Sequence, residues 1–456
     1  MTAVILDQLE AVLPDGAVVT DPDITAGYRQ DWAADPGAGT PVAVVRATCT
    51  EDVQAVMRWA SQHRVPVVPR GTGTGLTGGS SAVDGGIVLS TERMRAVSVD
   101  PIARVAVAQP GLLNAEVKKA AAEHGLWYPP DPSSVDICSI GGNAATNAGG
   151  LCCVKYGVTT DYILGMQVVL ADGSAVRLGG PLLKDVAGLS LTKLFVGSEG
   201  TLGIITELTL RLIPPQPSAS TVVASFRSVE SAADAILMIT SQIRPAMLEF
   251  MDQASINAVE DTVRMGLDRN ARALLLAQSD SPGAAGTREI ETIVGACETH
   301  GATEVFDTDN AEEGEAFTAA RRSVLPATMA LGSVLLEDVG VPMRQLPSLI
   351  TGIEAISEDC NILIATVAHA GDGNAHPLIV FDSTDPDATE RAHVAFNRVM
   401  ELVIALDGTI TGEHGIGRLK RDWLPRQLGA DVMELNRRIK AALDPLGILN
   451  PGAVLA

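Results

Sequence analysis

Three histidines and one carboxylate lie in one part of the chain, near its end. His369 and His376 enclose the segment Ala-Gly-Asp-Gly-Asn-Ala, and Glu413 and His414 stand next to each other between two glycines. Imidazole nitrogens and a carboxylate, with one position left open, form the ligand set of a catalytic rather than a structural zinc-type site. The residue types therefore predict a metal centre whose open position accepts a substrate oxygen.

The first two histidines are expected to lie on a β-hairpin. Apolar runs at 362–368 and 377–381 flank them, and the Gly-Asp-Gly-Asn sequence between the runs is typical of a turn. His369 and His376 would then face each other across that turn. A lone histidine on a hairpin is more often structural, but the paired spacing together with Glu413 favours a ligand role. The remaining histidines, in helical or loop patterns, are read as structural: His63, His124, His300 and His393.

The neighbours Glu413 and His414 raise a geometric question. On a regular strand they would point to opposite faces and could not both reach one substrate. Gly412 and Gly415 flank the pair and permit a bend that resolves the difficulty.

The composition is that of a globular, acidic protein. Of its 456 residues 46% are hydrophobic and 19% charged, and the formal net charge is -22, which disfavours nucleic acid and anionic membranes as partners. No apolar run approaches the roughly eighteen residues of a membrane span, and the N-terminal segment is acidic, so we expect a cytoplasmic protein without a signal peptide. The six cysteines contain no Cys-x-x-Cys pair, which argues against an iron–sulfur cluster and favours reduced thiols.

The sequence pattern changes near residue 216, which divides the chain into two regions. The first has short β-rich runs ended by glycine or proline, with helical patterns at 51–63, which Thr50 would cap, and at 113–124. Prolines among residues 214–217 mark the boundary, because they can continue neither a helix nor a central strand. The expected strands of this region are 42–45, 65–68, 86–89, 105–108, 166–170 and 203–206.

The second region alternates helical patterns with apolar runs. Helices are expected at 229–243, 288–300 and 311–330, and a strand at 273–277. This alternation of helices and strands predicts a sheet covered by helices on one face. An amphipathic helix at 431–443 is the last expected element.

A glycine-rich loop occupies residues 69–79. It contains Gly-x-Gly-x-x-Gly from Gly73 to Gly78, but the sequence then runs directly into another strand rather than a helix, so a Rossmann dinucleotide site is rejected. The Gly-Lys-Ser/Thr ending of a Walker loop is also missing. Successive backbone N–H groups without Cβ atoms still form a concavity suited to a pyrophosphate. The alternative is a glycine-rich connector without a ligand.

Further glycine-rich segments weaken that alternative. They cover residues 139–150, 155–162 and 195–205, and a Pro-Pro-Asp-Pro-Ser-Ser segment begins at 129. Glycine-rich backbone lets a ligand approach closely, and several such segments in one region indicate a large flat ligand.

Taken in order, these segments carry a family resemblance. PRGTGTGLTGGS, PPDPSS, SIGGNAATNAGG, KYGVTTDYILGMQVVLADG and LFVGSEGTLGII resemble the flavin domain of the vanillyl-alcohol-oxidase/PCMH family of FAD enzymes. HAGDGNAH, GEHGIGRLKR and LDPLGILNPG resemble its branch of 2-hydroxy-acid dehydrogenases: the glycolate oxidase FAD-linked subunit, D-lactate dehydrogenase and D-2-hydroxyglutarate dehydrogenase. The match covers nearly the whole chain.

The resemblance implies an α+β fold in three parts. A PCMH-type FAD-binding domain of two subdomains would span residues 1–216. An α+β substrate-binding cap domain with an antiparallel sheet would span 217–420. A C-terminal helical segment, 421–456, would pack back on the FAD domain.

The resemblance also implies where FAD binds. The loop from Arg70 to Gly79 would wrap the diphosphate, and other positions would line the isoalloxazine, the ribityl chain and the adenosine end. No histidine lies in this loop, so FAD is expected to be non-covalent. The implied FAD residues are Arg70, Gly71, Thr72, Gly73, Thr74, Gly75, Leu76, Thr77, Gly78, Gly79, Pro130, Asp131, Ser134, Gly141, Gly142, Gly149, Tyr156, Gly157, Glu199, Gly203, Ile205 and Asn450.

For the reaction centre, the resemblance implies that His369, His376 and Glu413 bind a divalent metal, zinc first, with manganese or iron as alternatives. The metal would polarise the 2-hydroxyl oxygen, and His414 would remove its proton while flavin N5 accepts the α-hydride. Asn374 is expected to donate a hydrogen bond to the substrate.

Arg321 matches the family's substrate-carboxylate arginine, a residue type suited to bidentate pairing, with the adjacent Arg322 as the alternative. Hydroxyglutarate-type relatives carry a lysine in the strand at 334–342, and this chain does not. The difference favours lactate or glycolate over D-2-hydroxyglutarate. Glu337 and Asp338 of the same strand are read as strand-end structure rather than catalysis.

Two other functions remain open. One is a flavin-holding subunit of a multi-subunit glycolate oxidase, whose partner would carry the substrate chemistry. The other is a non-redox FAD enzyme such as an alkyl-dihydroxyacetonephosphate synthase. The expected electron acceptor is a quinone, a cytochrome, an electron-transfer flavoprotein or oxygen, and the expected oligomer is a homodimer.

Overall fold

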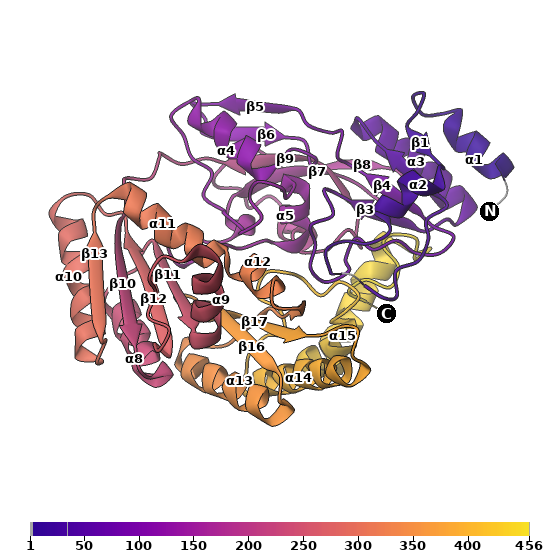
Figure 1. Ribbon diagram of the computed structural model, residues 1–456. Coiled ribbons are helices and arrows are strands. Elements are labelled where there is room, and N and C mark those ends of the chain that lie inside the picture. Colours follow the sequence, from indigo (N-terminus) through magenta and orange to yellow (C-terminus); the bar gives the residue numbers. More distant parts are fainter. Residues whose placement is uncertain (1–2, 34, 456) are drawn as a thin grey trace. The chain divides into compact units, whose positions relative to one another are not determined.

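The computed structural model describes residues 3–33 and 35–455. The chain forms two compact units (Figure 1). The first consists of Met1–Gly149, Val158–Pro215 and Glu413–Ala456, and the second of Gly150–Gly157 and Gln216–Gly412. Among the described helices, none combines the length and the apolar character needed to cross a bilayer.

A four-stranded sheet lies in the N-terminal part of the first unit. Its strands are β1 (Val18–Val19), β2 (Ala43–Arg46), β3 (Val67–Arg70) and β4 (Ile87–Ser90). The order is β1-β2-β4-β3, with β2, β4 and β3 parallel and β1 antiparallel to β2. β2, β3 and β4 begin one or two residues later than the sequence patterns indicate. The glycine loop starts directly where β3 ends.

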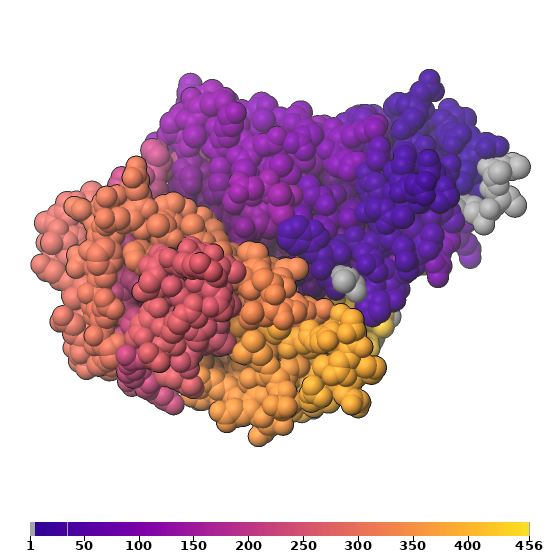
Figure 2. Space-filling view, viewed as in Figure 1, coloured from indigo at the N-terminus to yellow at the C-terminus, as the bar shows by residue number. Residues whose placement is uncertain are grey.

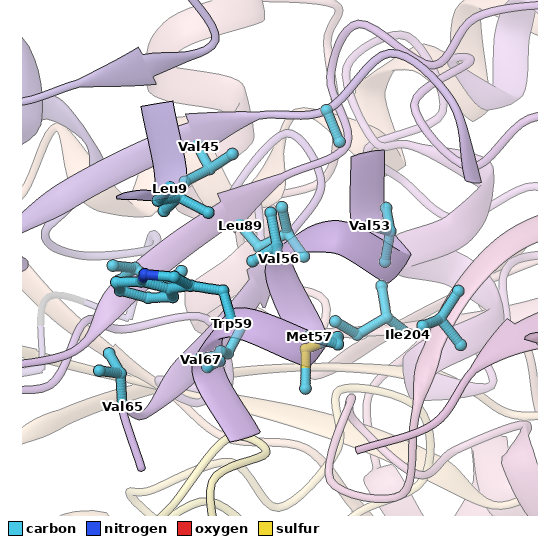
Figure 3. Packing of buried hydrophobic residues seen from close by; sticks show 14 of the residues in the cluster. Leu9, Val45, Val53, Val56, Met57, Trp59, Val65, Val67, Leu89 and Ile204 are labelled. Carbon is cyan, nitrogen blue, oxygen red and sulfur yellow. The ribbon is translucent and has the colours of Figure 1, made fainter. Parts of the chain in front are cut away.

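A dense apolar core supports this sheet (Figure 3). The helix α3 (Thr50–His63) contributes Val53, Met57 and Trp59, which pack with Leu89 of β4. Burying side chains of this size stabilises the fold by about 1.5–3 kcal/mol each relative to exposure. The expected cap of α3 was misplaced by one residue, since Cys49 is the N-cap and Thr50 is the first helical residue.

The second sheet of this unit is antiparallel throughout. Its strands are β5 (Val97–Asp100), β6 (Val105–Ala108), β7 (Ile163–Val169), β8 (Ala175–Gly179) and β9 (Ile204–Arg211), in the order β5-β6-β9-β7-β8. Two sheets in one unit agree with the expected two-subdomain architecture. The helices and turns of the unit outside α3 are α1 (Ala3–Glu10), α2 (Pro22–Thr25), η1 (Ala26–Tyr28), α4 (Asn114–Ala122), α5 (Ile140–Thr146), η2 (Thr159–Asp161), α7 (Leu191–Phe195), η4 (Arg421–Trp423) and α15 (Leu424–Leu443).

The C-terminal segment completes the first unit. Ile439 and Leu443 of α15 pack against the core of the antiparallel sheet. Beyond the helix, the Asn450 N–H donates to the Val67 carbonyl of β3 at 2.8 Å. The helix expected at 431–443 is the second part of α15, which is interrupted at Gly429 by a non-helical backbone conformation.

The second unit is built on one eight-stranded antiparallel sheet. The strand order is β13-β10-β12-β11-β16-β17-β14, and β15 also pairs with β17. The strands are β10 (Ser220–Phe226), β11 (Met247–Asp252), β12 (Ala273–Ser279), β13 (Glu304–Thr308), β14 (Ser333–Leu336), β15 (Val339–Gly340), β16 (Leu363–His369) and β17 (Asn374–Phe381). The antiparallel sheet of the expected cap domain is therefore present.

Helices pack against both faces of this sheet, so the expectation of a single covered face was wrong. Leu274 and Leu276 of β12 share a core with α9, and the intervening Leu275 is buried as well, at 1% exposure. Side chains of α9 cover the face turned to the viewer (Figure 2). The helices are α8 (Val229–Gln242), α9 (Gln253–Val263), α10 (Ala284–Thr299), α11 (Ala311–Arg322), α12 (Val324–Met329), α13 (Leu346–Cys360) and α14 (Pro386–Ala405), with the short α6 (Cys153–Tyr156) and η3 (Met343–Gln345).

The single helix expected at 311–330 is two helices, α11 and α12, which meet at Ser323. Pro326 lacks an N–H and cannot donate to the carbonyl four residues earlier, so the hydrogen-bond ladder breaks at this point. The break makes Arg321 a residue of the last turn of α11.

Candidate active site

The hairpin of β16 and β17 presents three polar side chains on one face of the large sheet. His369 pairs with Asn374, and Val367 pairs with His376, so His369, Asn374 and His376 share a face because side chains alternate along a strand. The two imidazole rings lie 5.1 Å apart between centroids and are nearly perpendicular, at 83°. Both histidines are buried. The structure therefore brings the two sequence-predicted imidazoles together within the second unit.

A third buried residue, Glu249, fixes the first imidazole. It pairs with His369 across β11 and β16, and its carboxylate lies 2.8 Å from His369 Nδ1. A carboxylate at Nδ1 holds the ring proton there and directs the Nε2 lone pair outward, as is usual for a metal-binding histidine. Glu249 was not predicted from the sequence. The available signal was an acid inside the otherwise apolar run of β11.

Arg321 lies on the other side of the same carboxylate. Its Nη2 atom is 2.8 Å from Glu249, and the side chains of both residues are nearly inaccessible, at 5% and 1% exposure. The neighbouring Arg322 instead forms an ion pair with Glu315 on α11 at 3.4 Å. Of the two arginines, the favoured one is thus next to the imidazole pair.

Asp338 is a second buried acid beside the hairpin. One carboxylate oxygen accepts the Thr411 hydroxyl at 2.6 Å and the Gly412 N–H at 2.9 Å. The other oxygen lies 3.8 Å from His376 Nδ1. Its carboxylate therefore faces the hairpin and anchors the chain before Glu413, in addition to the strand-end position predicted from the sequence.

The chain bends at Glu413 and His414 rather than forming a strand. Gly415 has a φ of +88°, a conformation that glycine adopts readily. Gly412 has no room for a side chain, since a Cβ atom would lie 2.4 Å from the Asn374 amide. The geometric difficulty of a regular strand therefore does not arise.

These side chains offer two sets of candidate metal ligands. In one set, ligand atoms of His369, His376 and Glu413 lie within 4.8 Å of one another, and in the other those of Asp338, His376 and His414 do. Glu413 directly follows Gly412, the last residue of the second unit. Nitrogen and carboxylate oxygen donors in this number fit zinc, manganese or iron. Asn374 adds a buried amide oxygen that has no partner among the described residues.

The glycine loop of the first unit fits a diphosphate. Arg70 ends β3 with its guanidinium buried under the loop, and a Cβ atom on Gly73, whose φ is +76°, would lie 2.0 Å from that guanidinium. Burial lowers the pKa of Arg70, and the nearby Asp31 opposes that shift. The Thr72 hydroxyl oxygen is buried and has no hydrogen-bond partner among the described residues. A cation, a permissive backbone and an unpaired polar atom are the features that an anionic ligand would complete.

Glu199 lies between the glycine loop and the C-terminal segment of the first unit. Its carboxylate accepts the N–H groups of Ile416 at 2.7 Å and Gly417 at 2.9 Å. Burial raises its pKa to about 7, although these two hydrogen bonds act in the opposite direction. Asn450 donates to the carbonyls of Gly79 and Glu199. Both residues therefore connect parts of the expected FAD site to one another.

The remaining expected FAD residues have varied surroundings. Gly141 and Gly142 open α5 behind the N-cap Ser139, and a Cβ atom on Gly141 would lie 2.4 Å from Pro110. A Cβ atom on Gly203 would lie 2.5 Å from Val168. Close protein packing thus requires these two glycines. Pro130, Asp131 and Ser134 lie in the loop before α5, Gly149 follows it, and Ile205 is on β9.

Tyr156 and Gly157 belong to the second unit. The Tyr156 hydroxyl and the Lys155 amine both donate to the buried carboxylate of Asp280, which also accepts the Gln216 amide at 2.8 Å. Burial alone would favour the neutral acid, but the hydrogen bonds from Lys155 and Tyr156 lower the pKa of Asp280. The segment around Tyr156 is therefore anchored to the sheet of the second unit.

The fold and these sites define an FAD-linked oxidoreductase. Residues 215–454 match the family described as FAD linked oxidases, C-terminal domain, and residues 41–179 match the FAD binding domain. The chain belongs to the FAD-linked oxidases and has the fold of the PCMH/vanillyl-alcohol-oxidase superfamily. p-Cresol methylhydroxylase shares that fold, with a TM-score of 0.82 at 18% identity over 99% of this chain and 96% of that one.

Three named relatives match this chain over most of its length and most of their own. Glycolate oxidase subunit GlcD of Bacillus subtilis is 42% identical over 91% of this chain and 89% of its own. D-lactate dehydrogenase of Archaeoglobus fulgidus is 34% identical over 92% and 93%. Probable mitochondrial D-lactate dehydrogenase of Danio rerio is 36% identical over 91% and 84%.

Proposed function

We propose that this protein is an FAD-dependent, divalent-metal-assisted dehydrogenase that oxidises a small D-2-hydroxy acid of the lactate or glycolate type to the 2-oxo acid. The observation that carries the proposal is the cluster of His369, Asn374 and His376 on one buried sheet face, with Glu249 orienting the first imidazole. Polar groups in an apolar sheet are costly unless they bind something. The names of the relatives, glycolate oxidase and D-lactate dehydrogenase, favour the same substrate class.

Each residue has a part in this reaction. When bound, FAD supplies the hydride acceptor and the cation supplies a Lewis acid for the hydroxyl oxygen. His414 takes the hydroxyl proton, and Arg321 pairs with the substrate carboxylate. Asn374 donates a hydrogen bond that fixes the substrate between them. His369, His376 and Glu413 hold the cation.

The supply of cations supports a substrate with one carboxylate. Arg321 is the one cation that this proposal assigns to the substrate, and the strand at 334–342 offers no lysine for a second acid group. A dicarboxylate such as 2-hydroxyglutarate would therefore carry an uncompensated charge into the site. FAD is proposed to bind non-covalently, and electrons are proposed to leave it for a quinone, a cytochrome, an electron-transfer flavoprotein or oxygen.

The test is anaerobic reduction of the bound flavin by single turnover. The holoenzyme would be mixed with D-lactate, L-lactate, glycolate and D-2-hydroxyglutarate, and the yellow absorbance followed. D-lactate or glycolate is expected to bleach it, and prior treatment with a chelator is expected to stop the bleaching until zinc or manganese is restored. Bleaching by none of the acids would overturn the proposal and favour a flavin-holding subunit. Bleaching that survives complete metal removal would exclude the metal.

A further inference from the structure

The segment Gly412–Gly417 carries Glu413 and His414 but has no regular secondary structure of its own. Three of its six residues are glycine, and glycine loses more conformational entropy than any other residue when its backbone is fixed. A metal ligand and a base on such a segment need anchors that hold the backbone in place. Two buried carboxylates, one from each unit, provide them.

Glu199 anchors the far end of the segment. Its two carboxylate oxygens accept consecutive backbone N–H groups, from Ile416 at 2.7 Å and from Gly417 at 2.9 Å. Its own backbone has a φ of +50° and its side chain is 8% exposed. A Cβ atom on Gly415 would lie 2.8 Å from this carboxylate. The chain therefore passes directly over the acid.

Asp338 anchors the near end in a similar way. One of its oxygens accepts the Gly412 N–H at 2.9 Å and the Thr411 hydroxyl at 2.6 Å, and the residue is completely buried. Backbone N–H donors to a carboxylate form charge-assisted hydrogen bonds, which are roughly twice as strong as neutral ones.

A third contact comes from the glycine loop expected to bind the FAD diphosphate. The Thr77 hydroxyl donates to the His414 carbonyl at 3.3 Å. The Thr77 carbonyl accepts the N–H groups of Arg418 at 2.9 Å and Leu419 at 3.1 Å. Within the first unit, the backbone of His414 is thus joined directly to that loop.

We propose that Glu199 and Asp338 are positioning residues, which fix Glu413 and His414 by holding backbone N–H groups at the two ends of Gly412–Gly417. The roles of Glu413 and His414 rest on the proposed function, but the two anchors can be tested independently of it. For Glu199 an isosteric amide shows the difference, because its oxygen accepts one N–H while its NH₂ group opposes the other donor. For Asp338 a single oxygen accepts both donors, so the carboxylate must be removed as a whole, by alanine.

The first measurement is amide hydrogen exchange of the FAD-loaded protein. In Glu199→Gln the amides of Ile416 and Gly417 are expected to exchange at least about tenfold faster, and in Asp338→Ala the amide of Gly412 is expected to do so. Glu207→Gln on β9, which removes an ion pair with Arg177 of β8, is the control and should leave all three amides protected. Unchanged exchange in Glu199→Gln and Asp338→Ala would overturn the proposal.

The second measurement is the rate of flavin reduction by the acid that reduces the wild-type enzyme best. Both variants should lose about tenfold or more in the rate per bound FAD at saturating substrate, with KM within about threefold of the wild type. Faster exchange without a lower rate would show that the anchors serve folding only, which contradicts the positioning role.

The two proposals fail in different ways. If no acid reduces the wild-type flavin, the proposed function fails, and the exchange measurement still decides whether the carboxylates hold the segment. If a variant does not fold, amide hydrogen exchange in the wild-type protein tests the positioning role instead. The amides of Gly412, Ile416 and Gly417 must then be protected relative to Val186, a loop residue that is 97% exposed, and rapid exchange at all of them would overturn the inference.

Discussion

The Nδ1 atom of His369 lies 2.8 Å from the carboxylate of Glu249, and the two residues are direct partners on adjacent strands. The other carboxylate oxygen lies 2.8 Å from Nη2 of Arg321. One buried acid therefore holds an expected metal ligand and an expected substrate-binding cation at the same time. Loss of its charge should affect both.

Glu249→Gln should weaken metal binding by about 10- to 100-fold, because the partner that orients a metal-binding imidazole is lost. Equilibrium dialysis against zinc or manganese measures the effect. The variant also leaves Arg321 as a buried, unpaired cation, which should lower stability by about 3–5 kcal/mol.

A double variant separates these two effects. Glu249→Gln with Arg321→Met should regain most of the lost stability while metal binding stays weak. Glu354→Gln, which breaks a half-exposed ion pair with Arg272 at 2.8 Å, is the matched control and should leave metal binding unchanged. Wild-type metal affinity in Glu249→Gln would contradict the orienting role.

His414→Ala should slow flavin reduction by about 10²- to 10⁴-fold, the usual contribution of a positioned general base. FAD content should not change, because the His414 contact to the glycine loop uses the backbone carbonyl rather than the side chain. Stopped-flow absorbance checks the rate. His393→Ala, on the exposed side of α14, should behave like the wild type. Equal rates in both variants would remove His414 from the mechanism.

Thr72→Val should reduce FAD affinity by about tenfold or more while leaving the FAD-free protein as stable as before. The hydroxyl is buried without a protein partner among the described residues, so its removal costs the empty protein nothing. A hydrogen bond to a charged ligand contributes about 1.5–3 kcal/mol. Fluorescence titration with FAD gives the affinity, and Thr72→Ser should restore it. If Thr72→Val destabilises the apoprotein instead, the hydroxyl serves the fold.

Asp252 predicts a pH-dependent stability of the second unit. It caps α9 through the Ser255 N–H and accepts the Thr366 N–H of β16, both at 2.7 Å. Burial raises its pKa to about 6, against the effect of these hydrogen bonds. Between the ordinary pKa of an aspartate and about 6, the folded state therefore binds more protons than the unfolded state. Stability should fall as pH rises through this window, by on the order of 3 kcal/mol.

Asp252→Asn cannot titrate and should lack this slope, although it is less stable at every pH because its NH₂ group opposes one of the two donors. Urea unfolding from pH 4 to pH 7, as the difference between wild type and variant, isolates the contribution. Asp385→Asn, at the exposed cap of α14, is the control. A difference that does not vary with pH would show that Asp252 is already ionised throughout.

Local sequence patterns predicted several parts of the candidate site. The turn chemistry between two apolar runs predicted the hairpin, and pairing of His369 with Asn374 follows from the turn. The glycine loop was predicted to bind an anion because backbone without Cβ atoms is readable from residue types. The bend at Glu413 was likewise foreseen from its flanking glycines.

The non-local partners could not be foreseen. Glu249 is 120 residues from His369 in the chain, and periodicity specifies which face a side chain takes but not which strand lies beside it. The same limit applies to Asp338 and Gly412. The helices on both faces of the large sheet were missed because a fully apolar strand such as β12 has the same pattern whether it is covered by one layer or by two, and only the neighbours distinguish the cases.

The division of the chain into two units also affects how the protein folds during its synthesis. The polypeptide changes unit at 149/150, 157/158, 215/216 and 412/413, so each unit is assembled from separated pieces. A ribosome that has released only the first 215 residues has not yet produced Asp280, the acid to which Lys155 and Tyr156 attach, nor the terminal stretch that closes the first unit. Domain-by-domain folding during synthesis is therefore unfavourable. We expect the nascent chain to depend on chaperones until its last residues emerge.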